Sequence, residues 1–139
     1  MPNVRTPRPS SKYYLPKHRY LTAYHYALQY QEWKDEYRSI GDDGAGLQID
    51  PQPHGTKTGN PTETKAIRRA ELKDKFSLIE SICEKVAPEI KMWLLRGVTV
   101  EGTSYIYLRQ MMRIPCGRDY YYDRRRAFYY ELSNEIEKQ

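Results

Sequence analysis

The spacing of apolar residues is the sequence feature that most constrains the fold of this chain. Apolar side chains recur at three- and four-residue intervals over much of its length, which is the repeat of an α-helix with one buried face. No segment keeps the alternation of apolar and polar residues that is typical of a β-strand. With 139 residues the chain has room for one ordinary domain. We therefore predict a small all-α protein.

Residues 1–40 are predicted to form a basic arm and an N-terminal aromatic helix. Residues 1–19 hold five basic side chains and no acidic ones. The helix is expected to begin near Pro16, because proline is favoured in the first helical turn, and to end near Ser39. Its aromatic stripe consists of Tyr20, Tyr24, Tyr30, Trp33 and Tyr37.

Residues 41–59 hold five glycines and two prolines, a composition that predicts a flexible linker. Because such a linker is long for a compact domain, the N-terminal helix is expected either to lie apart from the rest or to dock loosely.

Residues 60–139 are predicted to form a helical domain of their own. Asn60 as a cap and Pro61 in the first position begin a helix that runs to about residue 86, with Ile67 on its buried stripe. A shorter helix is expected over residues 89–96, with Gly97 ending it. Ser104 is a candidate cap for a helix over 105–112, and a turn over 113–117 leads to the last helix, 118–137.

The last two helices and their turn predict a C-terminal helix-turn-helix, with Ile114 as an apolar plug in the turn. On the last helix, Tyr121, Phe128 and Leu132 share one face and are expected to point inward. Arg118, Tyr122 and Arg126 are then expected to point outward. In such motifs the second helix enters the major groove of DNA.

Residues 109–126 hold six arginines and two aspartates, so a polyanion is the expected partner. Arg118 lies in the first turn, where arginine can bond guanine bidentately, and an aspartate can accept a hydrogen bond from cytosine. Arg124 to Arg126 are expected to contact phosphates. A solvated basic face and a tyrosine core are the plainer alternatives. The candidate DNA-binding residues are Arg113, Arg118, Asp119, Tyr120, Tyr122, Asp123, Arg124, Arg125 and Arg126.

Residues 114–126, Ile-Pro-Cys-Gly-Arg-Asp-Tyr-Tyr-Tyr-Asp-Arg-Arg-Arg, carry a family resemblance. They resemble the C-terminal helix-turn-helix of phage-encoded transcriptional regulators of the ArpU and RinA type, which in turn look like the promoter-reading region four of sigma factors. The resemblance spans roughly residues 65–135. More broadly, the segments at 15–20 and 30–34 are similar to segments of prophage proteins from Gram-positive bacteria. Pro115-Cys116 lengthens the turn and two aspartates interrupt the basic helix, so the register of base contacts departs from the family pattern.

The resemblance implies a sequence-specific DNA-binding regulator of phage late genes in the cytoplasm of a bacterial host. Double-stranded DNA is the implied partner, with host RNA polymerase and a second copy of the chain as further candidates. Two other functions stay open. A small terminase-like packaging protein would use its helices to build a ring. A phage protein-interaction module, for host takeover or anti-defence, would use the aromatic N-terminal helix as its contact surface.

The motifs of an enzyme are missing from the sequence. It has no phosphate loop, no paired carboxylates in an apolar setting and no nucleophile with a nearby base, so we expect no catalysis and no cofactor. Cys83 and Cys116 are expected to be free thiols, and the three scattered histidines do not predict a metal site. No run of apolar residues is long enough to predict a membrane partner.

Overall fold

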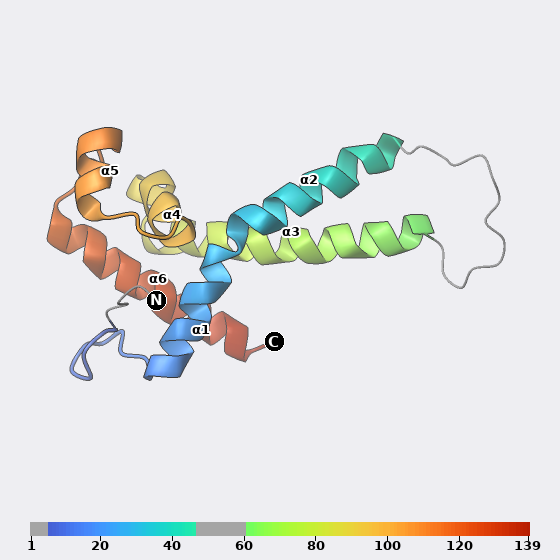
Figure 1. The fold of residues 1–139 in the computed structure, drawn as a ribbon. Coiled ribbons are helices and arrows are strands. Elements are labelled where there is room, and N and C mark those ends of the chain that lie inside the picture. The colour runs from blue at the N-terminus through green and yellow to red at the C-terminus, as the bar shows by residue number, and fades with distance from the viewer. Residues whose placement is uncertain (1–5, 47–60) are drawn as a thin grey trace. The chain divides into compact units, whose positions relative to one another are not determined.

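The structure is a computed structural model that describes residues 6–46 and 61–139, without the side chains of 42–46. The described residues contain no β-strand, which confirms the predicted all-α class (Figure 1). None of their helices has the length and apolar character needed to cross a bilayer. The elements are α1 (Lys17–Leu28), α2 (Tyr30–Gly46), α3 (Pro61–Val86), the 3-10 helix η1 (Pro88–Ile90), α4 (Lys91–Thr99), α5 (Tyr105–Met112) and α6 (Arg118–Glu137).

The chain forms two compact units that cut across the predicted segments. One unit combines residues 1–29 with 78–139, and the other contains residues 30–77. Helix α3 passes from the second unit into the first. Most of the predicted linker, residues 47–59, and the predicted cap Asn60 lie outside the described residues.

In the unit of residues 30–77, α2 and the first part of α3 pack as an antiparallel pair. The ring of Phe76 meets the rings of Tyr30 and Tyr37 edge-on, with centroids 6.3 and 5.1 Å away. Arg68 closes the pair with two hydrogen bonds to the carboxylate of Glu36, of 2.8 and 3.0 Å. Aromatic contact and a bidentate ion pair therefore fix how these two helices align.

The prediction of one continuous helix from Pro16 to Ser39 is wrong. The helix breaks at Gln29, whose N–H bonds the carbonyl of Tyr26, three residues back, at 3.2 Å. Helix α2 then continues beyond Ser39, through residues whose glycine content predicts a linker. At Gly41, inside this helix, a Cβ would overlap the guanidinium of Arg69.

Helix α1 packs across α6, so the expectation that the N-terminal helix lies apart or docks loosely is wrong for this half (Figure 1). The ring centroids of Tyr20 and Tyr24 lie 5.1 and 6.1 Å from that of Tyr129. Most of the aromatic stripe is buried, namely Tyr20, Tyr24, Tyr30 and Trp33. The stripe is therefore not the exposed contact surface that a protein-interaction module would need.

Gly97 does not end a helix, as the sequence predicted, but lies inside α4, which runs on to Thr99. A Cβ at this position would overlap the hydroxyl of Tyr121 on α6. The glycine is therefore explained by a close approach between two helices rather than by a helix end.

Helices α5 and α6 and their turn have the predicted bounds. The Ser104 hydroxyl accepts a hydrogen bond of 3.1 Å from the N–H of Tyr107, which confirms the predicted cap. Arg113 ends α5 in the left-handed conformation, with φ of 55°. Ile114 is fully buried as the predicted plug, and its N–H bonds the carbonyl of Leu108 at 3.0 Å.

Candidate nucleic-acid interface

The first turn of α6 is open to solvent. Gly117 is the N-cap and supplies no side-chain hydrogen bond, so the first N–H groups of the helix keep their capacity to bind an anion. A Cβ on Gly117 would meet open space. Arg118 is exposed, with its guanidinium 5.7 Å from the centre of the Tyr122 ring. The predicted outward position of Arg118 is confirmed.

Arg113 lies in the segment that joins α5 to the first turn of α6, and it is also exposed. Within the described part of the chain, its side chain makes no hydrogen bond or ion pair. Asp119 is exposed in the first turn of α6, where a carboxylate is favoured by the partial positive charge of the helix end. These residues give the turn two available cations and one available acceptor.

Tyr120 and Tyr122 are held by contacts within the chain. The Tyr120 hydroxyl donates a hydrogen bond to the carboxylate of Glu89 on η1. This bond raises the pKa of Tyr120 and lowers that of Glu89. Tyr122 is half-buried, and its hydroxyl accepts a bond of 3.4 Å from the N–H of Tyr105. Tyr120 therefore links α6 to η1, and Tyr122 links α6 to the start of α5.

Arg124, which the sequence predicts as a phosphate contact, is engaged in hydrogen bonds within the chain. Its Nη1 donates to the carbonyl of Val86 at 3.0 Å and its Nη2 donates to the Tyr13 hydroxyl at 3.0 Å. The carboxylate of Asp123 lies 2.6 Å from Nη2. The bond to Asp123, partly opposed by burial, raises the pKa of Arg124. Arg124 thus satisfies a carbonyl at the end of α3 and ties the N-terminal segment to α6, and Asp123 is its counter-ion rather than a free acceptor.

Arg125, also predicted as a phosphate contact, is half-buried and lies among tyrosines. Its guanidinium lies 5.2 Å from the ring centre of Tyr129, and its charge partly offsets the burial that raises the pKa of Tyr20. Its Nε has no exposed surface and, among the described residues, no hydrogen-bond partner. Burial opposes the charge, but the oxygens of the surrounding tyrosines, Tyr129 first, favour it and raise the pKa of Arg125. We call Tyr20, Tyr121, Tyr122 and Tyr129 the tyrosine cluster.

The remaining predicted residue, Arg126, is half-buried. The predicted inward face is confirmed, since Tyr121, Phe128 and Leu132 have no exposed surface. Arg125 follows Tyr121 by four residues and precedes Phe128 by three, which places it on that inward face. The helical repeat was a signal against Arg125, although Arg118 lies at nearly the same phase and is exposed, so phase alone does not separate the two.

Two arginines outside the predicted set also shape this surface. Arg109 on α5 donates from Nη1 to the carbonyl of Ile114 at 3.1 Å and so braces the turn. Arg96 on α4 lies against Tyr107, 3.4 Å from its hydroxyl. No acidic residue occurs between Gly102 and Arg118, so the surface of α5 and the turn carries no carboxylate of its own.

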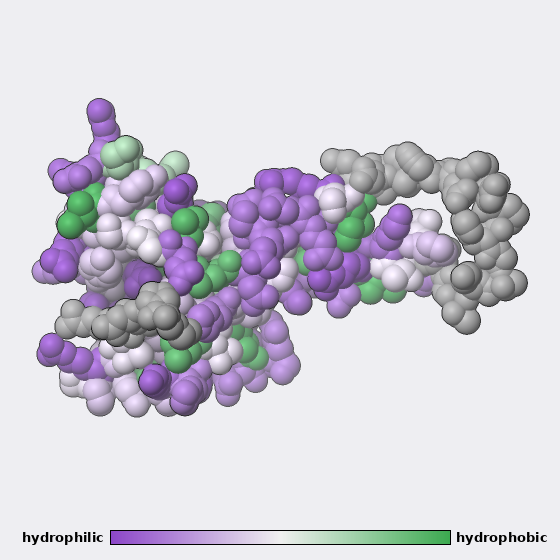
Figure 2. Space-filling view, viewed as in Figure 1, coloured by the Kyte–Doolittle hydropathy of each residue, from purple (hydrophilic) through white to green (hydrophobic). Residues whose placement is uncertain are grey.

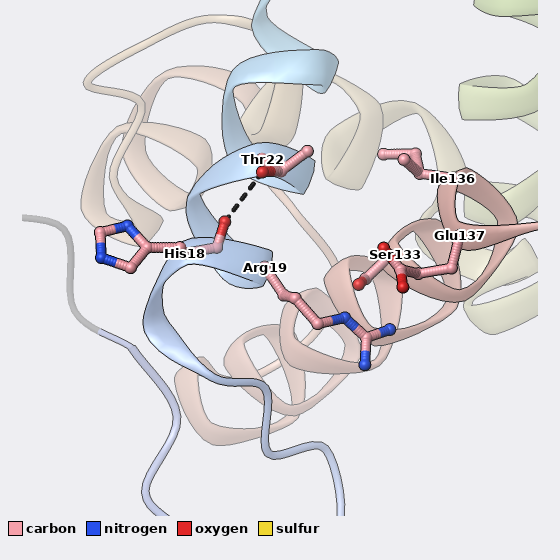
Figure 3. A pocket seen from close by; sticks show the side chains of 6 residues that line it. All are labelled: His18, Arg19, Thr22, Ser133, Ile136 and Glu137. Atoms are coloured by element: carbon pink, nitrogen blue, oxygen red, sulfur yellow. Dashed lines mark hydrogen bonds between the residues drawn. The ribbon is translucent and has the colours of Figure 1, made fainter.

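A shallow hollow of about 180 Å³ lies on the other side of this unit, between α1 and the end of α6 (Figure 3). It is lined by His18, Arg19, Thr22, Ser133, Ile136 and Glu137. The Thr22 hydroxyl is bonded to the carbonyl of His18 at 2.8 Å, so it is already engaged. The hollow is smaller than typical ligand pockets, which measure roughly 300–1,000 Å³.

Both cysteines are free, as predicted. Burial raises the pKa of the Cys83 thiol to about 12, so it is not a ready nucleophile at neutral pH. Burial also raises the pKa of Cys116. Among the described residues, no three side chains of the histidine, cysteine, aspartate or glutamate type are grouped closely enough to hold a metal ion.

Comparison with known proteins gives no match to a family model, a curated protein or a solved structure.

Proposed function

We propose that this protein binds double-stranded DNA through the turn between α5 and α6 and acts as a sequence-specific regulator. The observation that carries the proposal is the pair of exposed arginines, Arg113 and Arg118, at the uncapped start of a 20-residue helix. Helix N-termini attract phosphate through their free N–H groups, and arginine adds charge and paired donors.

The residues of α6 that are available for DNA contacts differ from those predicted from the sequence. Arg118 and Asp119 are the side chains available for base contacts, because they occupy the first turn and are exposed. Arg113 is the phosphate contact from the turn. Arg124 and Arg125 are excluded from the interface, since their guanidinium groups serve the fold. The finer proposal, control of phage late genes with host RNA polymerase, rests on the resemblance of residues 114–126 alone.

The test compares the affinity of the full chain for a short random-sequence duplex over a series of salt concentrations. We expect Arg113→Gln to weaken binding to all sequences and to lower the salt slope by about one, the amount expected for one lost phosphate contact. Lys73→Gln is the matched control, because Lys73 is an exposed lysine on α3 and the change removes the same charge. Equal loss in both variants would reduce the effect to net charge, and unchanged binding in Arg113→Gln would overturn the proposal.

Sequence preference is tested by selection of bound duplexes from a random pool. We expect a short consensus with the wild-type chain. We expect Arg118→Gln to lose the preference at one base pair, a discrimination of about 1–3 kcal/mol for a bidentate contact. Arg113→Gln should keep the consensus. A pool with no consensus, or a consensus that survives Arg118→Gln unchanged, would refute base reading by this turn.

A further inference from the structure

The outer face of α5 is apolar and exposed. Ile106 is 65% exposed and Met111 is 70% exposed, and Tyr107 and Gln110 lie between them on the helix surface. We call these four residues the α5 face. Figure 2 shows apolar side chains at the surface over α5, next to hydrophilic ones. Exposed apolar side chains that lie together mark a contact surface more often than isolated ones do.

Helix α4 extends this surface. Arg96 lies against Tyr107, and the Trp93 indole donates to the carbonyl of Met112 at 2.8 Å, so α4 and α5 run in opposite directions here. Met92 is 61% exposed and lies one turn before Arg96, at the end of the surface where Met111 lies. The apolar area therefore spans two helices.

Arginines border the α5 face on both sides. Arg109 follows Ile106 by three residues and lies along one edge, and Arg96 lies at the other. A symmetric pairing of two α5 faces would bring these arginines against their own copies, which repel each other. The surface instead requires an occupant that combines apolar and acidic side chains.

The chain has a surface of that kind on the first half of α3. Glu63, Ile67, Ala70, Glu71 and Asp74 are exposed and share one side of the helix, by their spacing of three and four residues. We call them the α3 strip. Ile67 is 56% exposed, although the sequence predicts it on a buried stripe. Within the described residues, the three carboxylates make no hydrogen bond or ion pair with each other or with a lysine or arginine.

We propose that the α5 face of one copy of this chain binds the α3 strip of a second copy, so that copies join head to tail. Ile67 would enter the apolar area between Ile106 and Met111, while Glu71 and Asp74 meet the bordering arginines. Two different surfaces are used, so each copy keeps one free surface of each kind and further copies can add. Neither surface includes Arg113 or Arg118, the proposed DNA contacts, and the inference does not depend on DNA binding.

The experiment measures mass in solution by analytical ultracentrifugation, at low salt, from micromolar to millimolar concentration. We expect the mass of the wild-type chain to rise with concentration beyond that of two copies, and to fall back as salt is added. Ile106→Asp with Met111→Asp removes the α5 face, and Glu71→Lys with Asp74→Lys reverses the α3 strip. Each double variant is expected to stay monomeric, with its helix content checked by circular dichroism.

Mixing the two double variants is the decisive step. Each retains the surface that the other lacks, so an equal mixture should form pairs of one copy of each and nothing larger. Glu32→Lys with Glu137→Lys is the matched control, because it makes the same charge change at exposed carboxylates outside the strip and should assemble like the wild type. A wild-type chain that stays monomeric, a mass that stops at two copies, or a mixture that remains monomeric would each overturn the proposal.

Discussion

Arg118 and Arg125 lie seven residues apart on α6, two turns along nearly the same side of one helix. Arg118 is exposed, whereas the Nε of Arg125 has no exposed surface. The difference comes from what lies opposite each residue. Tyr20 and Tyr129 surround Arg125, while Arg118 precedes the part of α6 that is packed against other helices. The helical phase of an arginine therefore does not decide whether it is exposed. The first turn of α6 lies before the part of the helix that other elements cover, so Arg118 stays exposed.

Alkaline pH is expected to destabilise the buried part of α6 most strongly, because tyrosines surround Arg125. Burial raises the pKa of Tyr121 to about 12 and also raises those of Tyr129 and Tyr20. The folded chain then binds more protons than the unfolded chain above the ordinary tyrosine pKa of 10.0. Stability is therefore complete below about pH 10 and is lost as pH rises towards 12, by about 1.4 kcal/mol per pH unit for each such tyrosine.

The measurement is urea unfolding at increasing pH, together with the absorbance of ionised tyrosine. We expect part of the tyrosine to ionise only when the helix signal is lost, in one cooperative step. Complete ionisation near pH 10 with the helices intact would show that the cluster around Arg125 is open to water.

Substitution of Arg125 itself is the next largest expected effect. Arg125→Ala leaves a cavity among Tyr20, Tyr121 and Tyr129 and removes the cation over the Tyr129 ring. We expect a loss of about 1–3 kcal/mol in the free energy of unfolding, because a half-buried side chain loses its packing as well as its charge. Arg125→Met, which retains most of the volume, should lose less. The control is Arg118→Ala, and equal stability of the two alanine variants would contradict the inward position of Arg125.

The local structure around these arginines was predictable because it depends on short-range rules. The bounds of α5 and α6 follow from a serine cap, a turn and an apolar repeat. The helical phase of Arg125 indicated an inward position, but a charge there is unfavourable until Tyr20 of α1 joins the tyrosines of α6 around it. Tyr20 is 105 residues away in the sequence, and nothing local indicates that it packs there.

The other mispredicted features also depend on contacts between helices, whereas the correctly predicted ones depend on short-range rules. Gly97 and Gly41 read as helix ends because glycine has a low helix propensity. Each lies inside a helix, at a place where a side chain from another helix, Tyr121 or Arg69, occupies the space of a Cβ. The exposure of Ile67 likewise depends on which helices pack together. A single sequence gives the periodicity of a helix but not its neighbour.

Substitution of Gly97 tests the packing of α4 against the buried part of α6. Gly97→Ala places a Cβ on the Tyr121 hydroxyl, and we expect a loss of about 1–3 kcal/mol, the usual cost of overpacking. Tyr121→Phe removes that hydroxyl, which has no hydrogen-bond partner among the described residues, so it should cost little alone. The double variant should recover most of the stability lost in Gly97→Ala. Additive losses, measured by urea unfolding, would show that the two groups do not meet.

The smallest expected effect concerns the exposed end of the same helix. Arg118→Gln removes a side chain whose contact within the chain is a ring 5.7 Å away, so the free energy of unfolding should change by less than about 0.5 kcal/mol. Arg124→Gln and Arg125→Gln should each lose more, because those guanidinium groups hold α3, the N-terminal segment or the tyrosine cluster. A series in which Arg118→Gln destabilises as much as Arg125→Gln would mean that the first turn of α6 is packed too. That turn would then be unavailable to a DNA groove. Both the proposed interface and the contrast between an exposed Arg118 and an enclosed Arg125 would be wrong.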